Sequence, residues 1–237
     1  IATQRPLEEK IALFWHGVFC VGYAKVEHCR EIKVLVDRFR RRGLGRLTDL
    51  LADTDVVIFS DFNYGYLCNE VRGLALGICR EKGLVTAADS QSSSQIGDVG
   101  NYLDMHLVTP TEREARLALH DREAGLVVLA QRLQQQLRTH NVILTLGKDG
   151  VLIHHPRSAS ANDFDTDAIP ALNRDPKDPL GAGDAFLVGA ALALGAKRDI
   201  WTAGWLGSIC SAYEVSCIGN APVSRVGILP LLNGTGH

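Results

Sequence analysis

The chain has 237 residues, of which 46% are hydrophobic and 22% charged, and its formal net charge at pH 7 is −2. This length can bury a sizeable core, and the near-neutral charge argues against a broad surface for nucleic acid or acidic membranes. The six cysteines have no Cys-x-x-Cys spacing, and no apolar run reaches the roughly 18 residues of a membrane span. No signal peptide is visible. We therefore expect a cytoplasmic protein with reduced thiols that binds neither nucleic acid nor membranes.

The predicted elements alternate between short apolar strands and amphipathic helices. In chain order we expect extended structure over residues 11–27, a helix over 31–52, a strand over 55–61, a helix over 69–83 and strands over 84–89 and 105–108. There follow helices over 109–119 and 124–139, two strands within 141–155, a loop over 156–177 containing one strand, and helices over 183–195 and 199–214. This alternation predicts an α/β fold with a mostly parallel sheet and helices on both faces. Ligands of such folds gather at the carboxyl ends of the strands.

The stretch DPLGAGDAFLVGAAL (178–192) joins a glycine-rich turn to an apolar, alanine-rich helix. Glycines let backbone amides approach a ligand closely, and a helix start presents unpaired N–H groups, so the turn suits a phosphate. Asp184 at this helix start could accept a proton from a hydroxyl beside it. It could equally serve as an ordinary helix cap.

The order of the segments around this turn resembles the ribokinase-like (PfkB) family of sugar kinases. The segments that carry the resemblance are SDFNYG (60–65), AADSQ (87–91), LVTPTEREA (107–115), VILTLGKDGVLI (142–153), GAGD (181–184) and GNAPVS (219–224). Within the family the chain looks most like the heptose-phosphate kinase branch, which is often fused to a nucleotidyltransferase. The resemblance implies a lid-like β segment over residues 1–30, a ribokinase-like α/β core over 31–237, incomplete at its N-terminal side, and a homodimer formed through the lid strands.

The resemblance also implies roles for individual residues in an ATP- and Mg²⁺-dependent transfer to a sugar or sugar phosphate. Asp184 would be the base, and the backbone amides of Gly181, Ala182, Gly183 and Asp184 would form the anion hole. Glu114, with Thr111, would hold magnesium through water. Further binding residues would be Thr145, Gly147 and Gly150 for the nucleotide phosphates and ribose, Ser208, Gly219 and Asn220 for adenine, and Asp61, Asp89 and Lys10 for the acceptor. A monovalent cation is compatible with this set.

Several of these residues also have a simpler structural explanation. An acid in a first helical turn, such as Glu114, is favourable through the helix dipole alone. Gly147 and Gly150 could simply form the turn of a hairpin. Asp61 and Asp89 end predicted strands, where acids also occur as ordinary turn residues. The residues by themselves leave both explanations open.

The chain departs from the family pattern mainly on the acceptor side. Tyr64 stands where the branch has Lys, Ser90-Gln91 where it has Pro-Lys, Thr111 where the family has Asn, and Pro179-Leu180 where it has two threonines. The acceptor therefore need not be a heptose phosphate, and the change at Thr111 weakens the expected water network around magnesium.

The start of the chain leaves a second function open. The chain begins at Ile1, its one methionine is Met105, and the family's Gly-Gly-x-x-Asn segment is not found, while RPLEEK (5–10) looks like the lid region. We therefore expect the encoded protein to be longer. The alternative to a kinase is a nucleotide-binding pseudokinase or a regulatory module of a larger fused protein. A dinucleotide-dependent dehydrogenase is disfavoured, because no Gly-x-Gly-x-x-Gly follows a first strand.

Overall fold

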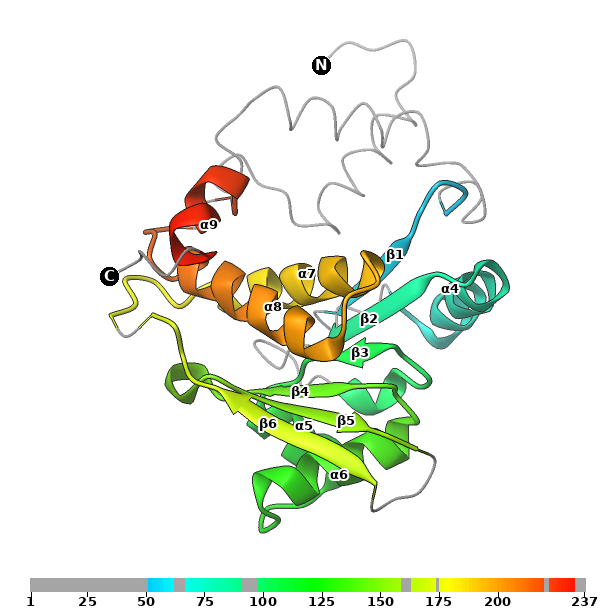
Figure 1. Ribbon diagram of the computed structural model, residues 1–237. Helices are drawn as coiled ribbons and strands as arrows, with labels where there is room; N and C mark the ends of the chain where they lie inside the picture. Colours follow the sequence, from blue (N-terminus) through cyan, green and yellow to red (C-terminus); the bar gives the residue numbers. More distant parts are fainter. Residues whose placement is uncertain are drawn as a thin grey trace, which may run out of the picture.

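The computed structural model describes residues 51–61, 67–90, 98–158, 163–173, 175–219 and 222–232 (Figure 1). The predicted lid over residues 1–30 and nearly all of the predicted helix over 31–52 lie outside the described residues. The same is true of Lys10, Tyr64, Gln91 and Asn220.

The described strands form one six-stranded sheet in the order β1-β2-β3-β4-β5-β6. These are β1 (Val56–Asp61), β2 (Val85–Ser90), β3 (Leu107–Val108), β4 (Val142–Thr145), β5 (Val151–Pro156) and β6 (Phe164–Ile169). Strands β1 to β4 pair in parallel, and β5 pairs antiparallel with both β4 and β6. The carboxyl ends of β1 to β4 therefore lie along the same edge of the sheet.

Helices cover both faces of this sheet, which confirms the predicted α/β class. Figure 1 shows α7 and α8 on one face and α4, α5 and α6 on the other. Their bounds are α4 (Asn69–Lys82), α5 (Glu112–Leu119), α6 (Leu126–Leu137), α7 (Ala182–Gly195) and α8 (Ile200–Glu214). The sequence analysis did not anticipate α9 (Arg225–Leu232), a short helix that contains Pro230. Among the helices of the described residues, none has the length and hydropathy of a membrane span.

The strands divide the core into two layers because their side chains alternate between the two faces of the sheet. Ala88 of β2 packs with α5 and α6 residues, including Leu133, whereas its neighbour Ala87 packs with α7 and α8 residues, including Phe186. Helices cover both faces at β1 and β4, so VVIF and VIL read as continuous apolar runs, whereas the edge strand β6 is only partly buried. The same alternation directs the next residue of β2, Asp89, toward the α7 layer.

Glycines allow α7 and α8 to lie close together and fix the position of α7 over the sheet. A Cβ atom at Gly189 of α7 would lie 2.8 Å from Cys210 Sγ, and one at Gly207 of α8 would lie 2.9 Å from the Phe186 carbonyl oxygen. A Cβ at Gly195 would collide with Val56 of β1. These close approaches place the start of α7 at the carboxyl edge of the sheet, because its far end is held against the first residue of β1.

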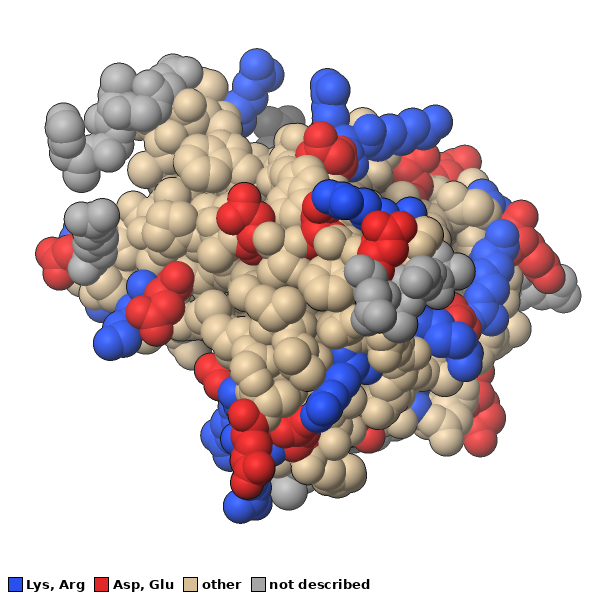
Figure 2. All heavy atoms as spheres, turned by 60° about the horizontal axis from the view of Figure 1, so that its bottom comes forward, with Lys and Arg blue, Asp and Glu red and all other residues tan. Residues whose placement is uncertain are grey.

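Charged side chains of both signs are interspersed on the face of the molecule that Figure 2 shows. Among the described residues, Asp104 makes ion pairs with Arg138 Nε at 2.8 Å and with Arg80 Nη2 at 2.9 Å. Such exposed pairs contribute little to stability. On the face that Figure 2 shows, neither sign dominates.

Candidate active site

The predicted ligand residues gather along the carboxyl edge of the parallel strands. Asp61 ends β1, Asp89 is the penultimate residue of β2, and Thr145 ends β4. Thr111 follows β3 and forms a parallel bridge with Thr145, whose N–H donates to the carbonyl of Pro110 at 2.9 Å. The sheet register therefore brings four segments that are distant in the sequence to one edge, as the α/β pattern predicts.

The Gly181 turn opens α7 without a side-chain cap. Gly181 is the N-cap residue in the left-handed conformation, with φ 86° and ψ −5°. The first turn thus keeps the partial positive charge of a helix start, and the Ala182 N–H donates to the Pro179 carbonyl at 3.4 Å. Gly183 is exposed, and a Cβ there would meet nothing within 4 Å. Gly181 holds the N-cap position and Asp184 is the acidic residue of the first turn, where the helix dipole favours it.

Asp89 is a buried acid in an electrostatic environment that disfavours its charge. It is 6% exposed, and within the described residues its Oδ1 has no hydrogen-bond partner. Burial, followed by the negative charges of Glu114 and Asp184, raises the pKa of Asp89 to about 8. Glu114 of α5 and Asp184 in the first turn of α7 therefore lie close enough to Asp89 of β2 for their charges to raise its pKa. Such a site favours either a bound proton or a cation.

Glu114 takes part in a capping box at the start of α5. Its Oε2 accepts hydrogen bonds from the N–H and the hydroxyl of Thr111, both at 2.8 Å, and its own N–H donates to Thr111 Oγ1 at 3.2 Å. This reciprocal arrangement identifies Thr111 rather than Thr109 as the cap. Glu114 is only 7% exposed, and its charge reaches Asp89. Glu114 therefore stabilises the start of α5, and the same capping box holds its carboxylate beside the predicted site.

The turn between β4 and β5 follows the predicted pattern of two strands around a glycine turn. Gly147–Asp149 forms a single 3-10 turn, and the Leu146 N–H donates to the Gly150 carbonyl at 2.8 Å. Gly150 has φ +93°, and a Cβ there would lie 2.7 Å from Ala171 N and collide with the Ile169 carbonyl. Gly147 has φ +59° but open space around it. Gly150 is thus required by packing, whereas Gly147 leaves room beside the backbone.

The predicted adenine residues lie in and beyond α8. Ser208 is buried within α8, next to Gly207, which packs on Phe186 of α7. Gly219 follows the helix with φ +74° in open space. Asn220 lies outside the described residues. The structure therefore describes Ser208 and Gly219, and their contact with adenine stays a prediction.

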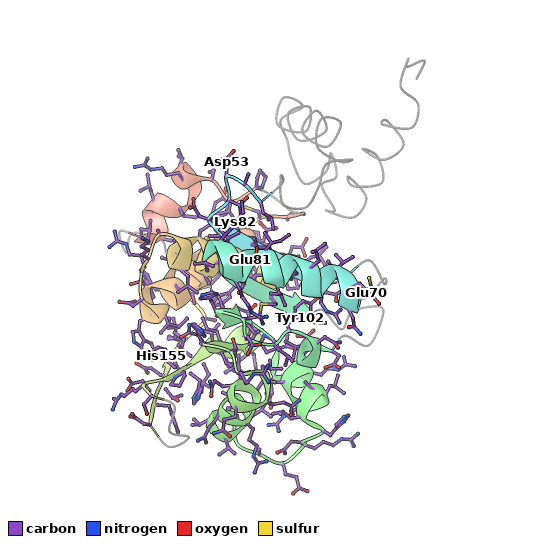
Figure 3. All side chains as sticks on the ribbon, turned by 90° about the vertical axis from the view of Figure 1, so that its right-hand side faces the viewer. Asp53, Glu70, Glu81, Lys82, Tyr102 and His155 are labelled. Atoms are coloured by element: carbon purple, nitrogen blue, oxygen red, sulfur yellow. The ribbon has the colours of Figure 1, made fainter. Side chains whose placement is uncertain are left out.

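Asp61 lies on the opposite face of the sheet from Asp89. Its Oδ2 accepts a hydrogen bond at 2.7 Å from the hydroxyl of Tyr102, a fully buried residue that lies beneath α4 (Figure 3). The Arg72 guanidinium lies 5.4 Å from the centroid of the Tyr102 ring, and burial together with Asp61 raises the pKa of the Tyr102 hydroxyl. The two acids predicted to face the acceptor thus point into different layers.

Two residues with polar contacts at this edge had no role in the sequence analysis. Tyr102 belongs to the loop after a single 3-10 turn, Val99–Asn101, where the sequence has no regular pattern. Asp178 stands before Pro179, and aspartate followed by proline is a common turn signal. That signal predicts a local turn but not the hydrogen bond that Asp178 Oδ2 accepts from the Gly219 N–H at 3.1 Å.

The fold and the acidic edge beside a glycine turn together define an α/β domain suited to phosphoryl transfer. A family model described as pfkB family carbohydrate kinase matches residues 37–224, and the chain belongs to this family. It is 30% identical over 184 residues to the bifunctional protein HldE of Shewanella amazonensis, covering 77% of this chain and 36% of that protein. It is 25% identical over 241 residues to HldE of Helicobacter hepaticus, covering 98% of this chain and 46% of that protein. The chain thus spans less than half the length of these relatives, which belong to the branch that the sequence resemblance indicated.

Solved structures of sugar kinases share the fold. Phosphofructokinase-2 of Escherichia coli in complex with potassium aligns with a TM-score of 0.65 at 13% identity, covering 79% of this chain and 60% of that one. Ribokinase of Thermotoga maritima aligns with a TM-score of 0.59 at 18% identity, covering 78% of this chain and 59% of that one. These likenesses confirm the ribokinase-like α/β fold expected from the sequence.

Proposed function

We propose that the protein containing this chain is an ATP-dependent kinase that transfers the γ-phosphoryl group to a hydroxyl of a sugar or sugar phosphate. Membership of a carbohydrate kinase family supports the class of reaction. The observation that carries the assignment of the site is that the charges of Glu114 and of Asp184, which lies in the first turn of α7 after Gly181, both raise the pKa of the buried Asp89. Acids that bind a cation, next to a turn that binds an anion, are the two features that phosphoryl transfer requires.

In the proposed reaction Asp184 accepts the proton of the acceptor hydroxyl. The hydroxyl oxygen then forms a bond to the γ-phosphorus as the bond between that phosphorus and the β–γ bridging oxygen breaks, and ADP leaves. Backbone amides of Gly181, Ala182, Gly183 and Asp184 stabilise the negative charge on the transferred group, as donors at a helix start do. Positioning and electrostatics of this kind provide most of the catalysis in phosphoryl transfer.

The residues at the edge fit a magnesium ion held largely through water. Glu114 and Thr111 would hold it, and the unpaired Oδ1 of Asp89 makes that residue a further candidate. Among the described residues no cluster of three or more ligating side chains is preformed, which suits a cation that keeps several of its waters. When bound, the ion neutralises charge on the nucleotide phosphates.

The remaining contacts follow from the same proposal. The nucleotide phosphates and ribose would lie along Thr145, Gly147 and Gly150, and adenine along Ser208, Gly219 and Asn220. Open space at Gly147 and Gly219 supports close approach of a ligand to the backbone. Asp61, Asp89 and Lys10 remain candidates for the acceptor side. The charge of Asp184 raises the pKa of Asp89, so these two acids lie close to each other. We also propose cytoplasmic location, a homodimer, a possible monovalent cation and a fused nucleotidyltransferase domain.

Full-length protein offered ATP, Mg²⁺ and a panel of sugars and sugar phosphates tests this proposal through ADP release. We expect stimulation by at least one acceptor, and a fall of roughly two to four orders of magnitude in turnover for Asp184→Asn. ATP affinity by calorimetry should change little. Asp199→Asn is the matched control, since Asp199 caps α8 by accepting from the Thr202 N–H at 2.7 Å, and its turnover should not change.

Two outcomes would contradict the proposal. ATP binding without release of ADP by any acceptor would favour the pseudokinase or regulatory module. Loss of ATP binding in Asp184→Asn with unchanged turnover would remove the role of Asp184 as the base.

A further inference from the structure

A group of histidines lies at the amino edge of the sheet, where β1 to β4 begin, opposite the edge with the candidate active site. His106 directly precedes β3, and His140 lies two residues before β4. His155 lies near the end of β5, which reaches the same edge because β5 runs antiparallel to β4. The rings of His106 and His140 are in contact, with centroids 4.7 Å apart and planes inclined by 57°. None of these histidines takes part in the proposed phosphoryl transfer.

His106 binds the neighbouring strand β2 through both its backbone and its ring. Its N–H donates to the Thr86 carbonyl at 3.0 Å, and its Nδ1 accepts a hydrogen bond from the Thr86 N–H at 3.1 Å. The Thr86 hydroxyl lies 3.0 Å from the same nitrogen. On the other side, the His106 carbonyl accepts a hydrogen bond from Asn141 Nδ2 at 2.8 Å. Strand β3 has only two residues, Leu107–Val108, so these bonds extend its pairing by one residue at its amino end.

The bond from Thr86 determines the protonation state of the His106 ring. A backbone N–H can only donate, so the Nδ1 that accepts it carries no proton. The ring is therefore neutral, with its one proton on Nε2. A proton added to Nδ1 would set two N–H groups against each other and break the bond. The neutral ring thus closes the contact between β2 and the start of β3, and the charged ring opens it.

The surroundings of His106 also oppose a charge on the ring. Burial, followed by the positive charge of His140, lowers the pKa of His106. Further ionisable groups at this edge are Asp104, Arg80 near the end of α4, Arg138 at the end of α6, and His155. Asp104 pairs with both arginines, and His155 Nδ1 lies 2.7 Å from Asn141 Oδ1. His106 therefore stays neutral near pH 7 and gains a proton only in acid.

We propose that His106, Thr86 and His140 form a pH-sensitive latch, in which the neutral His106 ring holds the start of β3 against β2 and acid releases it. The latch lies at the opposite edge of the sheet from the candidate active site, so the inference does not depend on the proposed function. The ring contact is not a metal site, because the Nδ1 lone pair already accepts a hydrogen bond. In addition, no group of three or more metal-ligating side chains occurs in the part of the chain that the structure describes.

Histidine-selective NMR and hydrogen exchange by mass spectrometry test the latch in the full-length protein, with EDTA present, between about pH 8 and pH 5. We expect the neutral His106 ring to carry its proton on Nε2 and to titrate below the ordinary histidine value of about 6.5. The opened form binds more protons than the closed form, so the free energy of opening falls as the pH falls. The peptide that contains Thr86 should therefore lose protection several-fold in acid, after correction for the intrinsic pH dependence of exchange.

Three substitutions by asparagine separate the latch from other effects. In His106→Asn the Oδ1 can replace Nδ1 as the acceptor and does not titrate, so the Thr86 peptide should keep its protection in acid. His140→Asn removes the neighbouring charge, so the pKa of His106 should rise and the loss of protection should become smaller. The matched control is His120→Asn, because His120 is the exposed C-cap of α5 with φ 51°, a conformation that asparagine tolerates. It should change neither result.

Three results would overturn the inference. A proton on Nδ1 of the neutral His106 ring would exclude the bond from Thr86. An equal loss of protection in His106→Asn and in the unchanged protein would assign the opening to another group. A pKa of His106 that stays the same in His140→Asn would remove His140 from the latch. If His106→Asn does not fold, the titration of His106 in the unchanged protein and in His140→Asn still decides the proposal.

The buried His154 does not interfere with this test. Burial, followed by the charge of His155, lowers the pKa of His154 to about 4, which is below the pH range of the measurements. Its ring also lies against another part of the sheet, where its Nδ1 is 3.2 Å from the Thr166 hydroxyl of β6. A change in protection of the Thr86 peptide between pH 8 and pH 5 therefore reports on His106.

Discussion

Replacing Asp89 by asparagine should change how the stability of the protein depends on pH. Asp89 is buried, its Oδ1 has no hydrogen-bond partner among the described residues, and Glu114 and Asp184 add negative charge nearby. Asparagine has nearly the same shape and carries no charge. The variant therefore removes the titration of this site and leaves the packing almost unchanged.

The size of the effect follows from the pKa of Asp89, which burial and the two neighbouring acids raise from 3.8 to about 8. Between these values the folded protein holds a proton that the unfolded chain has lost, so the free energy of unfolding falls as the pH rises. The slope is about 1.4 kcal/mol per pH unit and ends near pH 8. From pH 6 to pH 9 the protein should lose about 2 to 3 kcal/mol through this site, and Asp89→Asn should not.

Urea denaturation of both proteins at pH 6, 7, 8 and 9, in EDTA and without nucleotide, measures the difference. We expect the variant to be the more stable protein already at pH 6, because the slope begins near pH 3.8, and its advantage to grow by about 2 to 3 kcal/mol by pH 9. Asp121→Asn is the control, because backbone amides lower the pKa of that carboxyl and its titration lies below this range. A difference between Asp89→Asn and the unchanged protein that stays constant from pH 6 to pH 9 would refute the reasoning, since Asp89 would then be ionised throughout.

Two further predictions concern the elements that support the site. Gly150→Ala should lower the free energy of unfolding by about 3 kcal/mol or more, because a Cβ at this positive φ collides with the Ile169 carbonyl. Gly147 lies in open space, so Gly147→Ala should lower it by only about 1 kcal/mol. Chemical denaturation measures both losses, and equal losses would contradict this reasoning. Tyr102→Phe should cost about 1 to 3 kcal/mol, because the buried Asp61 carboxylate loses the hydroxyl that donates to it. A melting temperature unchanged by Tyr102→Phe would show that this bond is dispensable.

Much of the fold could be predicted from local patterns. The strand at Val56–Asp61, the helix at Asn69–Lys82 and the helix at Ala182–Gly195 lie within one or two residues of their predicted bounds. Apolar runs, glycine turns and caps produce these elements, and all of them depend on residues within a few positions of one another. The short helix at Arg225–Leu232 was missed, since eight residues with an internal proline have little helical pattern.

The sequence by itself also determined the Gly181 turn and the family, because each depends on short segments with a characteristic order of residues. Only the tertiary structure decided which acids meet. The charges of Glu114 and Asp184 act on Asp89, whereas Asp61 accepts a hydrogen bond from Tyr102 on the other face of the sheet. Side chains alternate along a strand, and the packed helices decide which layer each one enters and how far it is removed from water. Burial and register depend on contacts between distant segments, and no local pattern contains them.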